Sequence, residues 1–336
     1  MSKVKNKKEV SKPLVYINLK TDFGFKKAFG NKKRLMAFLN AILPERVTYI
    51  EYRHPEQFGH RAGDRKSVYD IYCKNDKGEY FIVEMQNAKQ PHFAERALFY
   101  ASYPILGQAP KGKVKIKDEH GKVTEQPWDY SIKRVYLVCI LNFIMFPEKS
   151  ARNIVIEHVK LVRLEANIVF TDKLEFVTIE LPKCKQKEGE LITMRDKWVY
   201  ILQNMEKLQK CPEQLHEEIF QQLFEDLKLD NLTPDEMETY NKSILEYDDV
   251  ILAIDYAKKM AEEKGEKRGE RKGRKEGRKE GRKEGRKEGR KEGKEEGEKE
   301  SLEKVVRRCF QQNIPVENIA EITNLSIKQI NAILTK

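Results

Sequence analysis

The segment "KSVYDIYCKNDKGEYFIVEMQNA", residues 66–88, decides the fold of this chain. Two runs rich in β-branched and aromatic residues flank Asp76-Lys77-Gly78, and this pattern is typical of a β-hairpin. An acid, Glu84, and an amide, Gln86, interrupt the apolar residues of the second run. Because an ionised carboxylate inside a core strand is costly to desolvate, the segment raises the question of what compensates Glu84.

The register of the hairpin predicts a partner for Glu84. If Gly78 takes the left-handed position of a three-residue loop, Asp70 lies opposite Glu84, with Cβ atoms about 4.5–5.5 Å apart. Gln86 then shares the face of the two acids. The opposite, apolar face is expected to hold Tyr69, Ile71, Cys73, Phe81, Val83 and Met85. A loop of two or four residues would instead separate the two acids, and that alternative stays open.

Two facing carboxylates repel each other unless a cation or a proton lies between them. Oxygen ligands of this kind suit Mg²⁺ or Mn²⁺, which leaves its other positions to water and substrate phosphate. The pair therefore predicts a site for phosphodiester chemistry. The alternative is that the two acids face solvent or are only hydrogen-bonded, and their spacing alone does not exclude it.

The surrounding pattern predicts an α/β domain. Residues 22–44 have helical spacing, with a start near Gly24 or a restart after Gly30, and residues 46–54 alternate as a first strand. After the hairpin, residues 92–106 return to helical spacing. Residues 134–146 form a nearly continuous apolar strand, expected to be buried on both faces. Two further strands are predicted over 158–164 and 174–182.

Several separated blocks also resemble a known family. They are "TDFGFKKAFG" (21–30), the opening segment, "ERALFYAS" (95–102), "WDYSIKRVYLVCILNF" (128–143) and "LEFVTIELPK" (174–183), followed by a late glycine repeat. In this order they resemble the recombination-promoting nuclease (Rpn) family of PD-(D/E)XK nuclease transposases, over roughly residues 15–205. The resemblance implies a restriction-endonuclease-like α-β-β-β-α-β core, a mixed sheet flanked by helices. It also implies that Asp70, Glu84 and the carbonyl of Met85 hold the metal.

Two positions depart from the pattern of that superfamily. Tyr69 precedes Asp70 where proline is usual, and Gln86 stands where a lysine is usual. An amide can orient a water molecule but cannot take its proton at neutral pH, so Gln86 is expected only to orient the attacking water. Proton removal would fall to a metal-activated water, to the scissile phosphate, or to Lys66 or Lys89, and the general base stays unassigned.

Three further residues are candidates for the site. Asp22 is expected to cap the first helix, and the alternative is a third acid that reaches the metal. Arg96 and Tyr100 lie four residues apart on the second predicted helix and would present one face to a phosphate. A surface arginine beside a core tyrosine would have the same spacing.

The composition favours a polyanionic partner. Lys and Arg number 65 against 54 Asp and Glu, a net charge of +11, so DNA is the expected ligand. The five cysteines have no zinc-type spacing, which indicates a reducing compartment. The longest apolar run, 135–146, is too short to span a bilayer, so no membrane association and a cytoplasmic location are expected.

The chain is expected to divide into five parts. They are a disordered basic leader (1–12), the nuclease-like domain (13–185), a helical region packed on it (186–262), a charged "GRKE" repeat (263–300) and a small helix-turn-helix-like unit (301–336). Nine glycines recur every fourth residue from Gly265 to Gly297, and the repeat is predicted to be a linker or a helix. The repeat or the last unit also offers a surface for homo-oligomers.

The sequence therefore predicts a Mg²⁺- or Mn²⁺-dependent DNA endonuclease. The family resemblance implies a role in recombination, mobile-element biology or phage defence. The alternative is a non-catalytic DNA-binding or oligomeric scaffold on a degenerate nuclease fold. The presence of both acids favours the enzyme.

Overall fold

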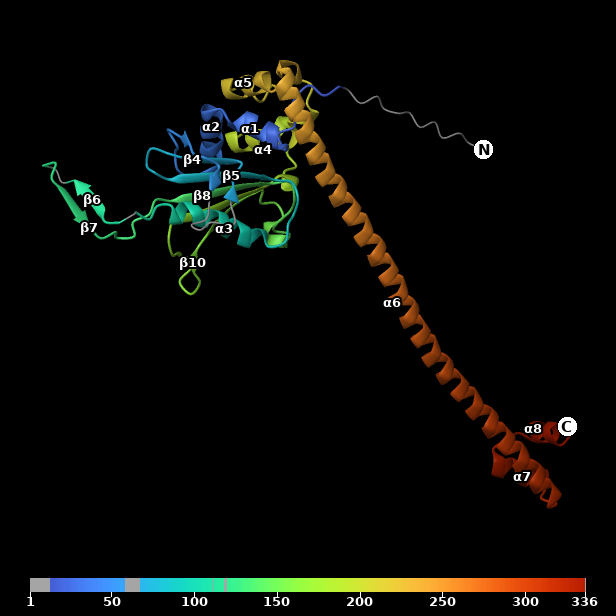
Figure 1. Ribbon diagram of the computed structural model, residues 1–336. Helices are drawn as coiled ribbons and strands as arrows, with labels where there is room; N and C mark the ends of the chain where they lie inside the picture. The colour runs from blue at the N-terminus through green and yellow to red at the C-terminus, as the bar shows by residue number, and fades with distance from the viewer. Residues whose placement is uncertain (1–12, 58–66, 111, 118–119, 336) are drawn as a thin grey trace. The chain divides into compact units, whose positions relative to one another are not determined.

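The computed structural model describes residues 13–57, 67–110, 112–117 and 120–335 (Figure 1). The predicted leader, residues 1–12, and Lys66 lie outside these ranges. The chain divides into two compact units, one ending at Asp255 and the other spanning Tyr256–Lys336. No described helix is long and apolar enough to cross a membrane.

The helices are α1 (Asp22–Phe29), α2 (Lys32–Ile42), α3 (Phe93–Leu106), α4 (Met194–Asn204), α5 (Glu218–Asp226), α6 (Pro234–Gln311), α7 (Val316–Thr323) and α8 (Ile327–Leu334). Short 3₁₀ helices are η1 (Lys149–Ala151), η2 (Leu181–Lys183), η3 (Glu188–Glu190), η4 (Met205–Lys207) and η5 (Leu229–Asn231). The strands are β1 (Glu51–Tyr52), β2 (Glu56–Gln57), β3 (Ser67–Val68), β4 (Ile71–Lys74), β5 (Tyr80–Gln86), β6 (Val114–Lys117), β7 (Val123–Gln126), β8 (Val135–Leu141), β9 (Ile156–Lys160), β10 (Val162–Arg163), β11 (Ile168–Val169) and β12 (Leu174–Glu180).

Six strands form the central mixed sheet of the first unit, in the order β1-β4-β5-β8-β12-β9. β5, β8 and β12 are parallel to one another, whereas β4 pairs with β5 and β9 pairs with β12 in antiparallel orientation. Every residue of β8 is buried, as predicted for a strand covered on both faces. The fold is a restriction-endonuclease-like α/β fold with a helical C-terminal extension.

The β4–β5 hairpin has the predicted register. Ile71 pairs with Val83 and Lys74 with Tyr80. Gly78 has φ of 83°, the left-handed conformation that a residue with a side chain rarely adopts, and its amide donates to the Asn75 carbonyl at 3.0 Å. The three-residue loop therefore sets the register that brings Asp70 to the end of the ladder opposite Glu84.

Helices cover both faces of the sheet. One face packs into a large apolar core with α1, α2, α4 and α5, where Phe29, Phe38 and Phe220 surround Trp198. The other face packs against α3 through a smaller cluster that includes Phe93 and Ala97. Hence the two faces of the hairpin have different surroundings. The face of β5 toward the large core carries apolar side chains, whereas Glu84 and Gln86 lie on the face toward α3.

The first predicted helix is divided in two. Asn31 has an extended backbone, and its side chain accepts hydrogen bonds from the amides of Lys33 and Arg34, so that a second helix begins at Lys32. In α1, Gly24 is required because a Cβ there would lie 2.2 Å from the Asn18 carbonyl oxygen. The segment before α1 therefore lies directly against the helix that follows it.

Two predictions from the hairpin region are wrong. The predicted strand over 46–54 is regular only at β1, Glu51–Tyr52. Tyr69 was expected on the apolar face with Met85, yet it belongs to the α3 cluster, where its hydroxyl donates to the Tyr100 carbonyl at 2.9 Å. The reason is a bend at Asp70, which ends the strict alternation before β4 begins.

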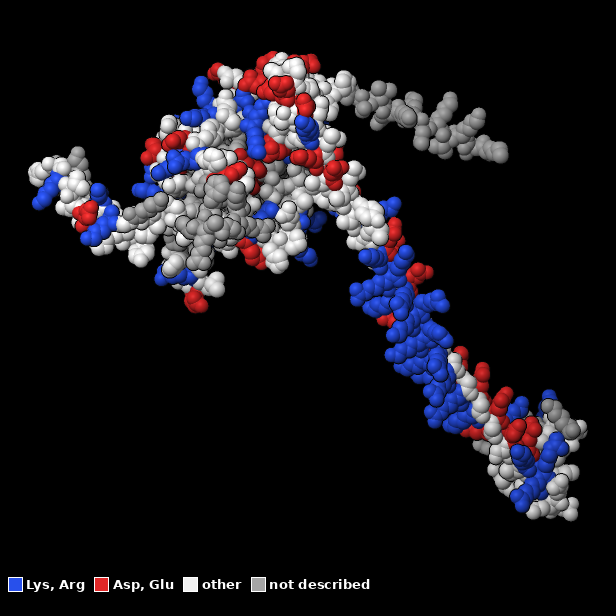
Figure 2. Space-filling model, viewed as in Figure 1, with Lys and Arg blue, Asp and Glu red and all other residues white. Residues whose placement is uncertain are grey.

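In the second unit, the end of α6 packs with α7 and α8 around Val306, Ile319 and Ile330. Asn324 makes the turn between the last two helices with φ of 58°, and Ser326 caps α8 in a reciprocal pair with Gln329, as expected of a helix-turn-helix-like unit. The repeat is helical within α6, and all of its described side chains are exposed. Lys and Arg side chains cover much of this stretch on the face that Figure 2 shows.

Candidate active site

The two acids meet where the β4–β5 ladder ends. Beyond the Ile71–Val83 pair, the Asp70 amide donates to Glu84 Oε1 at 3.2 Å and the Met85 amide donates to Asp70 Oδ2 at 2.8 Å. Side chains thus accept the hydrogen bonds that a continuing ladder would have made. Each carboxylate is held in place by a backbone amide beside the other acid, which fixes their positions without neutralising them.

Glu84 is almost fully buried, with 4% of its surface exposed, under the first turns of α3. It lines a narrow cavity with Phe93, Arg96, Tyr100 and Cys139. Burial and, next, the charge of Asp70 raise the pKa of Glu84 well above its usual range. Burial also raises the pKa of Asp70, although its hydrogen bond from the Met85 amide opposes this. The surroundings of the pair on their own therefore disfavour two negative charges.

Gln86 links Glu84 to Arg96. Its Nε2 donates to Glu84 Oε2 at 3.2 Å, and its Oε1 accepts a hydrogen bond from Arg96. The Arg96 guanidinium also donates to Gln90 Oε1 and lies over the rings of Phe93 and Tyr100, 5.4 and 5.7 Å from their centroids. The side-chain amide of Gln86 therefore orients the Glu84 carboxylate with its nitrogen and accepts a hydrogen bond from the Arg96 guanidinium with its oxygen.

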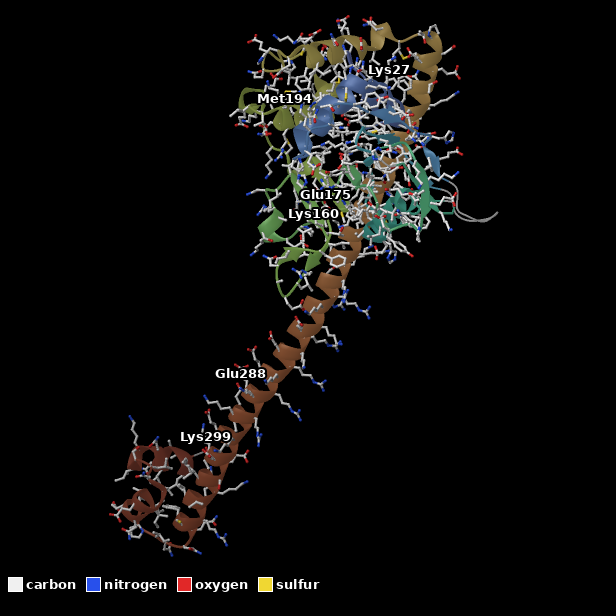
Figure 3. The ribbon with its side chains drawn as sticks, turned by 90° about the vertical axis from the view of Figure 1, so that its left-hand side faces the viewer. Lys27, Lys160, Glu175, Met194, Glu288 and Lys299 are labelled. Carbon is white, nitrogen blue, oxygen red and sulfur yellow. The ribbon has the colours of Figure 1, made fainter. Side chains whose placement is uncertain are left out.

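Other buried acids in the same sheet have direct cationic partners. Glu175 on β12 lies 2.7 Å from His158 Nδ1 and 3.0 Å from Lys160 Nζ, and Figure 3 labels Glu175 and Lys160 on their neighbouring strands. Glu180 lies 2.9 Å from Lys183 Nζ. Within the described residues, Asp70 and Glu84 form no ion pair with any Lys, Arg or His. Glu175 and Glu180 are thus compensated by cationic side chains, whereas the acid pair has no such partner among the described residues.

The donor set at the pair fits a hard divalent cation. The two carboxylates supply oxygen ligands, and the Met85 carbonyl points to the same side as the Met85 amide that contacts Asp70, because both groups of a strand residue project toward one neighbour. Such oxygen donors suit Mg²⁺ or Mn²⁺. In the described part of the chain, no three His, Cys, Asp or Glu side chains converge, so a backbone carbonyl would complete the protein ligands.

The other predicted site residues are only partly brought together. Asp22 is close enough for its charge to raise the pKa of Asp70, but it forms an ion pair with Lys26 at 2.8 Å. The predicted N-cap role of Asp22 is wrong, because Thr21 is the N-cap and its hydroxyl accepts from the Gly24 amide at 3.1 Å. Lys89 is exposed beyond β5.

Three hydroxyl groups on α6, missed from the sequence, bind the segment before α1, the start of α1 and the residue that follows β8. The Asn18 amide donates to Tyr240 Oη at 3.0 Å, and the Phe23 amide donates to Ser243 Oγ at 3.1 Å. Tyr247 Oη accepts from Asn142 Nδ2 at 3.5 Å, while the Asn142 amide donates to the Gln86 carbonyl at 2.9 Å. These three residues are spaced three and four positions apart, so the sequence could have shown that they lie on one face of a helix.

The raised pKa values predict how stability depends on pH in the absence of metal. A carboxyl whose folded pKa lies above its unfolded value contributes stability that is present below the unfolded pKa and is lost as pH rises through the folded pKa. In EDTA, the free energy of unfolding of the wild type relative to Glu84→Gln should therefore fall as pH rises from about 4. The fall is about 1.4 kcal/mol for each unit by which the pKa is raised.

Urea unfolding at several pH values measures this difference directly. Glu165→Gln, which changes an exposed acid in the turn between β10 and β11, is the matched control and should keep the wild-type pH dependence. A constant difference between wild type and Glu84→Gln from acidic to alkaline pH would contradict the raised pKa.

A family model described as "PD-(D/E)XK nuclease family transposase" matches residues 19–257 of the chain. The match includes the acid pair, α3 and the first turns of α6. No curated protein and no solved structure matches the chain.

Proposed function

The chain belongs to the PD-(D/E)XK nuclease family of transposases, and from this premise we propose that it is a metal-dependent DNA endonuclease. One observation carries the proposal. Asp70 and Glu84 are held side by side at a strand end, and among the described residues no Lys, Arg or His side chain forms an ion pair with them. Other buried acids in the sheet, Glu175 and Glu180, each have such a partner. A role in recombination, mobile-element movement or phage defence is the corresponding biological proposal, and the family description, which names a transposase, supports its mobile-element part.

Asp70, Glu84 and the carbonyl of Met85 would hold Mg²⁺ or Mn²⁺. When bound there, the cation would supply Lewis-acid stabilisation of charge at the phosphate and lower the pKa of water. The chain itself contributes fixed geometry, because the Asp70 and Met85 amides hold the carboxylates before substrate arrives. This pre-organisation means that the acids need no rearrangement at the moment of reaction.

Gln86 and Arg96 would act around the acids. Gln86 orients Glu84 through Nε2, and contact with a water molecule would require its amide to turn away from Glu84 or Arg96. Arg96 is half-buried over two aromatic rings, and its remaining donors suit a phosphate oxygen. No lysine contacts the acid pair within the described residues, so proton removal is assigned to no side chain here.

A plasmid-nicking assay tests the proposal. Purified full-length protein should convert supercoiled plasmid to nicked or linear forms with Mg²⁺ or Mn²⁺, and should leave it intact in EDTA, since the acids need a cation to approach phosphate. Ca²⁺, which has the same charge but a looser coordination geometry, is a matched control for simple charge neutralisation. Cleavage that proceeds equally in EDTA, or none with any divalent metal, would refute the proposal.

A further inference from the structure

A second cleft, of about 390 Å³, lies beside the edge of the sheet. Its lining includes Arg53, His54, Tyr72, Tyr80 and Tyr103, and we refer to it as the tyrosine cleft. Tyr72 belongs to β4, Tyr80 to β5 and Tyr103 to the second half of α3. The cleft therefore lies between the sheet edge and the helix that also covers Glu84.

Strand register places the tyrosine cleft on the same face of the sheet as the acid pair. Tyr80 and Glu84 are four residues apart on β5, and side chains alternate along a strand, so both project toward α3. Tyr72 faces Ile82, which lies between them. Arg53 continues β1 by one residue, since its amide donates to the Tyr72 carbonyl at 2.8 Å, and it therefore lies beside Tyr72 on that face.

The cleft combines cations with aromatic rings. Tyr72 and Tyr80 are stacked, with centroids 5.9 Å apart and planes at 16°, and Lys74 Nζ lies 5.2 Å from the Tyr80 centroid. Among the described residues, Arg53 forms a loose ion pair with Glu51, at 3.7 Å, and 48% of its side chain is exposed. A guanidinium that can turn toward solvent beside tyrosine rings suits a phosphate together with its base.

The distance from the acids matches a few nucleotides. Four residues of strand separate Tyr80 from Glu84 by about 13 Å. A DNA strand advances about 3.4 Å per nucleotide along a duplex axis, so about four nucleotides cover this distance. Because Ile82 and Tyr72 are buried under α3 on this face, a DNA strand has to pass around the helix, and about four nucleotides is the shortest span that reaches the tyrosine cleft.

We propose that the tyrosine cleft binds one nucleotide unit of the DNA strand that crosses the acid pair, with its phosphate on Arg53 and its base against the tyrosine rings. This inference rests on the proposed function for the direction of the strand. The cleft would then position the DNA strand at a fixed distance from the scissile phosphate, and it would take no part in the cleavage step at the acids.

The test uses full-length Glu84→Gln protein, so that binding is measured without cleavage. Adding Arg53→Ala should weaken binding of a short DNA oligonucleotide about tenfold, the typical loss of one charge-assisted contact, as measured by fluorescence anisotropy. Arg152→Ala is the charge-matched control, because Arg152 is exposed and precedes β9 at the opposite edge of the sheet. It should leave the affinity near that of the parent. Equal affinities of the two variants would overturn the inference.

Neutral methylphosphonate linkages placed one at a time locate the contact. One linkage, about four nucleotides or more from the cleavage position, should weaken binding to the parent and have no further effect on Arg53→Ala. Additive losses at every linkage would overturn the inference. Arg53-dependent binding without plasmid nicking would support the cleft and refute the nuclease, whereas nicking with unchanged Arg53→Ala binding would do the reverse.

Discussion

Glu84→Gln and Asp70→Asn should each reduce DNA cleavage by about 10²–10³-fold or more while the protein stays folded. Either change removes one of the two charged ligands for the cation but keeps the shape of the side chain. The Asp70 and Met85 amides retain an oxygen acceptor, so these two backbone hydrogen bonds persist, whereas Glu84→Gln loses the acceptor that Oε2 offers to Gln86 Nε2. Cleavage should be followed at saturating Mg²⁺ on supercoiled plasmid, with the melting temperature of each variant measured in parallel.

DNA binding separates this expectation from a general loss of structure. Removing a negative charge close to the phosphates of bound DNA should leave the affinity for DNA unchanged or slightly higher. These variants should therefore lose cleavage but keep DNA binding. Glu165→Gln again serves as control, since it removes an exposed acid outside the site. A wild-type cleavage rate in either acid variant would show that the pair is not the active site.

The acid pair could be predicted because its position depends on local rules. A three-residue loop with a left-handed glycine sets the register, and the register sets which side chains face each other. The alternation fails one residue further on, where Tyr69 turns to the α3 side. The pattern of the sequence gives no sign of the bend at Asp70, because it arises where side-chain oxygens replace ladder partners.

The surroundings of the pair depend on contacts between distant segments. Arg96 was a candidate from its spacing to Tyr100, but its link to Glu84 through Gln86 requires the packing of α3 on β5. The hydroxyls of α6 reach residues more than a hundred positions away, such as Asn18 and Asn142. Helical spacing shows that the hydroxyls share one face of α6. Which segments that face contacts depends on the three-dimensional fold.

The long helix connects these contacts to the charged repeat. α6 begins beside α1, where Tyr240 and Ser243 hold the segment that carries Asp22, and it continues through the repeat to Gln311. The same helix therefore supports the site at its start and carries the basic surface further along.

The isolated repeat, residues 263–300, should be mostly unfolded, although it is helical within α6. Each glycine costs about 0.8–1.0 kcal/mol relative to alanine in a helix, so nine glycines cost roughly 7–9 kcal/mol. The ion pairs within the described repeat, such as Lys272–Glu276 at 3.9 Å, place lysine before glutamate, the weaker order, and contribute only a few tenths of a kcal/mol each. No apolar face offsets the glycine cost, so the flanking parts of α6 must stabilise the repeat.

Replacing all nine glycines by alanine should convert the same peptide into a strongly helical one. A Cβ added at any of Gly265 to Gly297 meets no atom within 4 Å, so the substitutions carry no steric cost. A peptide with alanine only at Gly265, Gly281 and Gly297 should give intermediate helicity, because the gain is a sum of single-residue terms. Circular dichroism at micromolar concentration measures all three peptides. Strong helicity of the unmodified peptide that does not change on dilution would contradict the argument from glycine cost. Helicity that grows with concentration would instead show that copies of the peptide pack through the row of glycines. The alanine peptide, which lacks that row, would not show this concentration dependence.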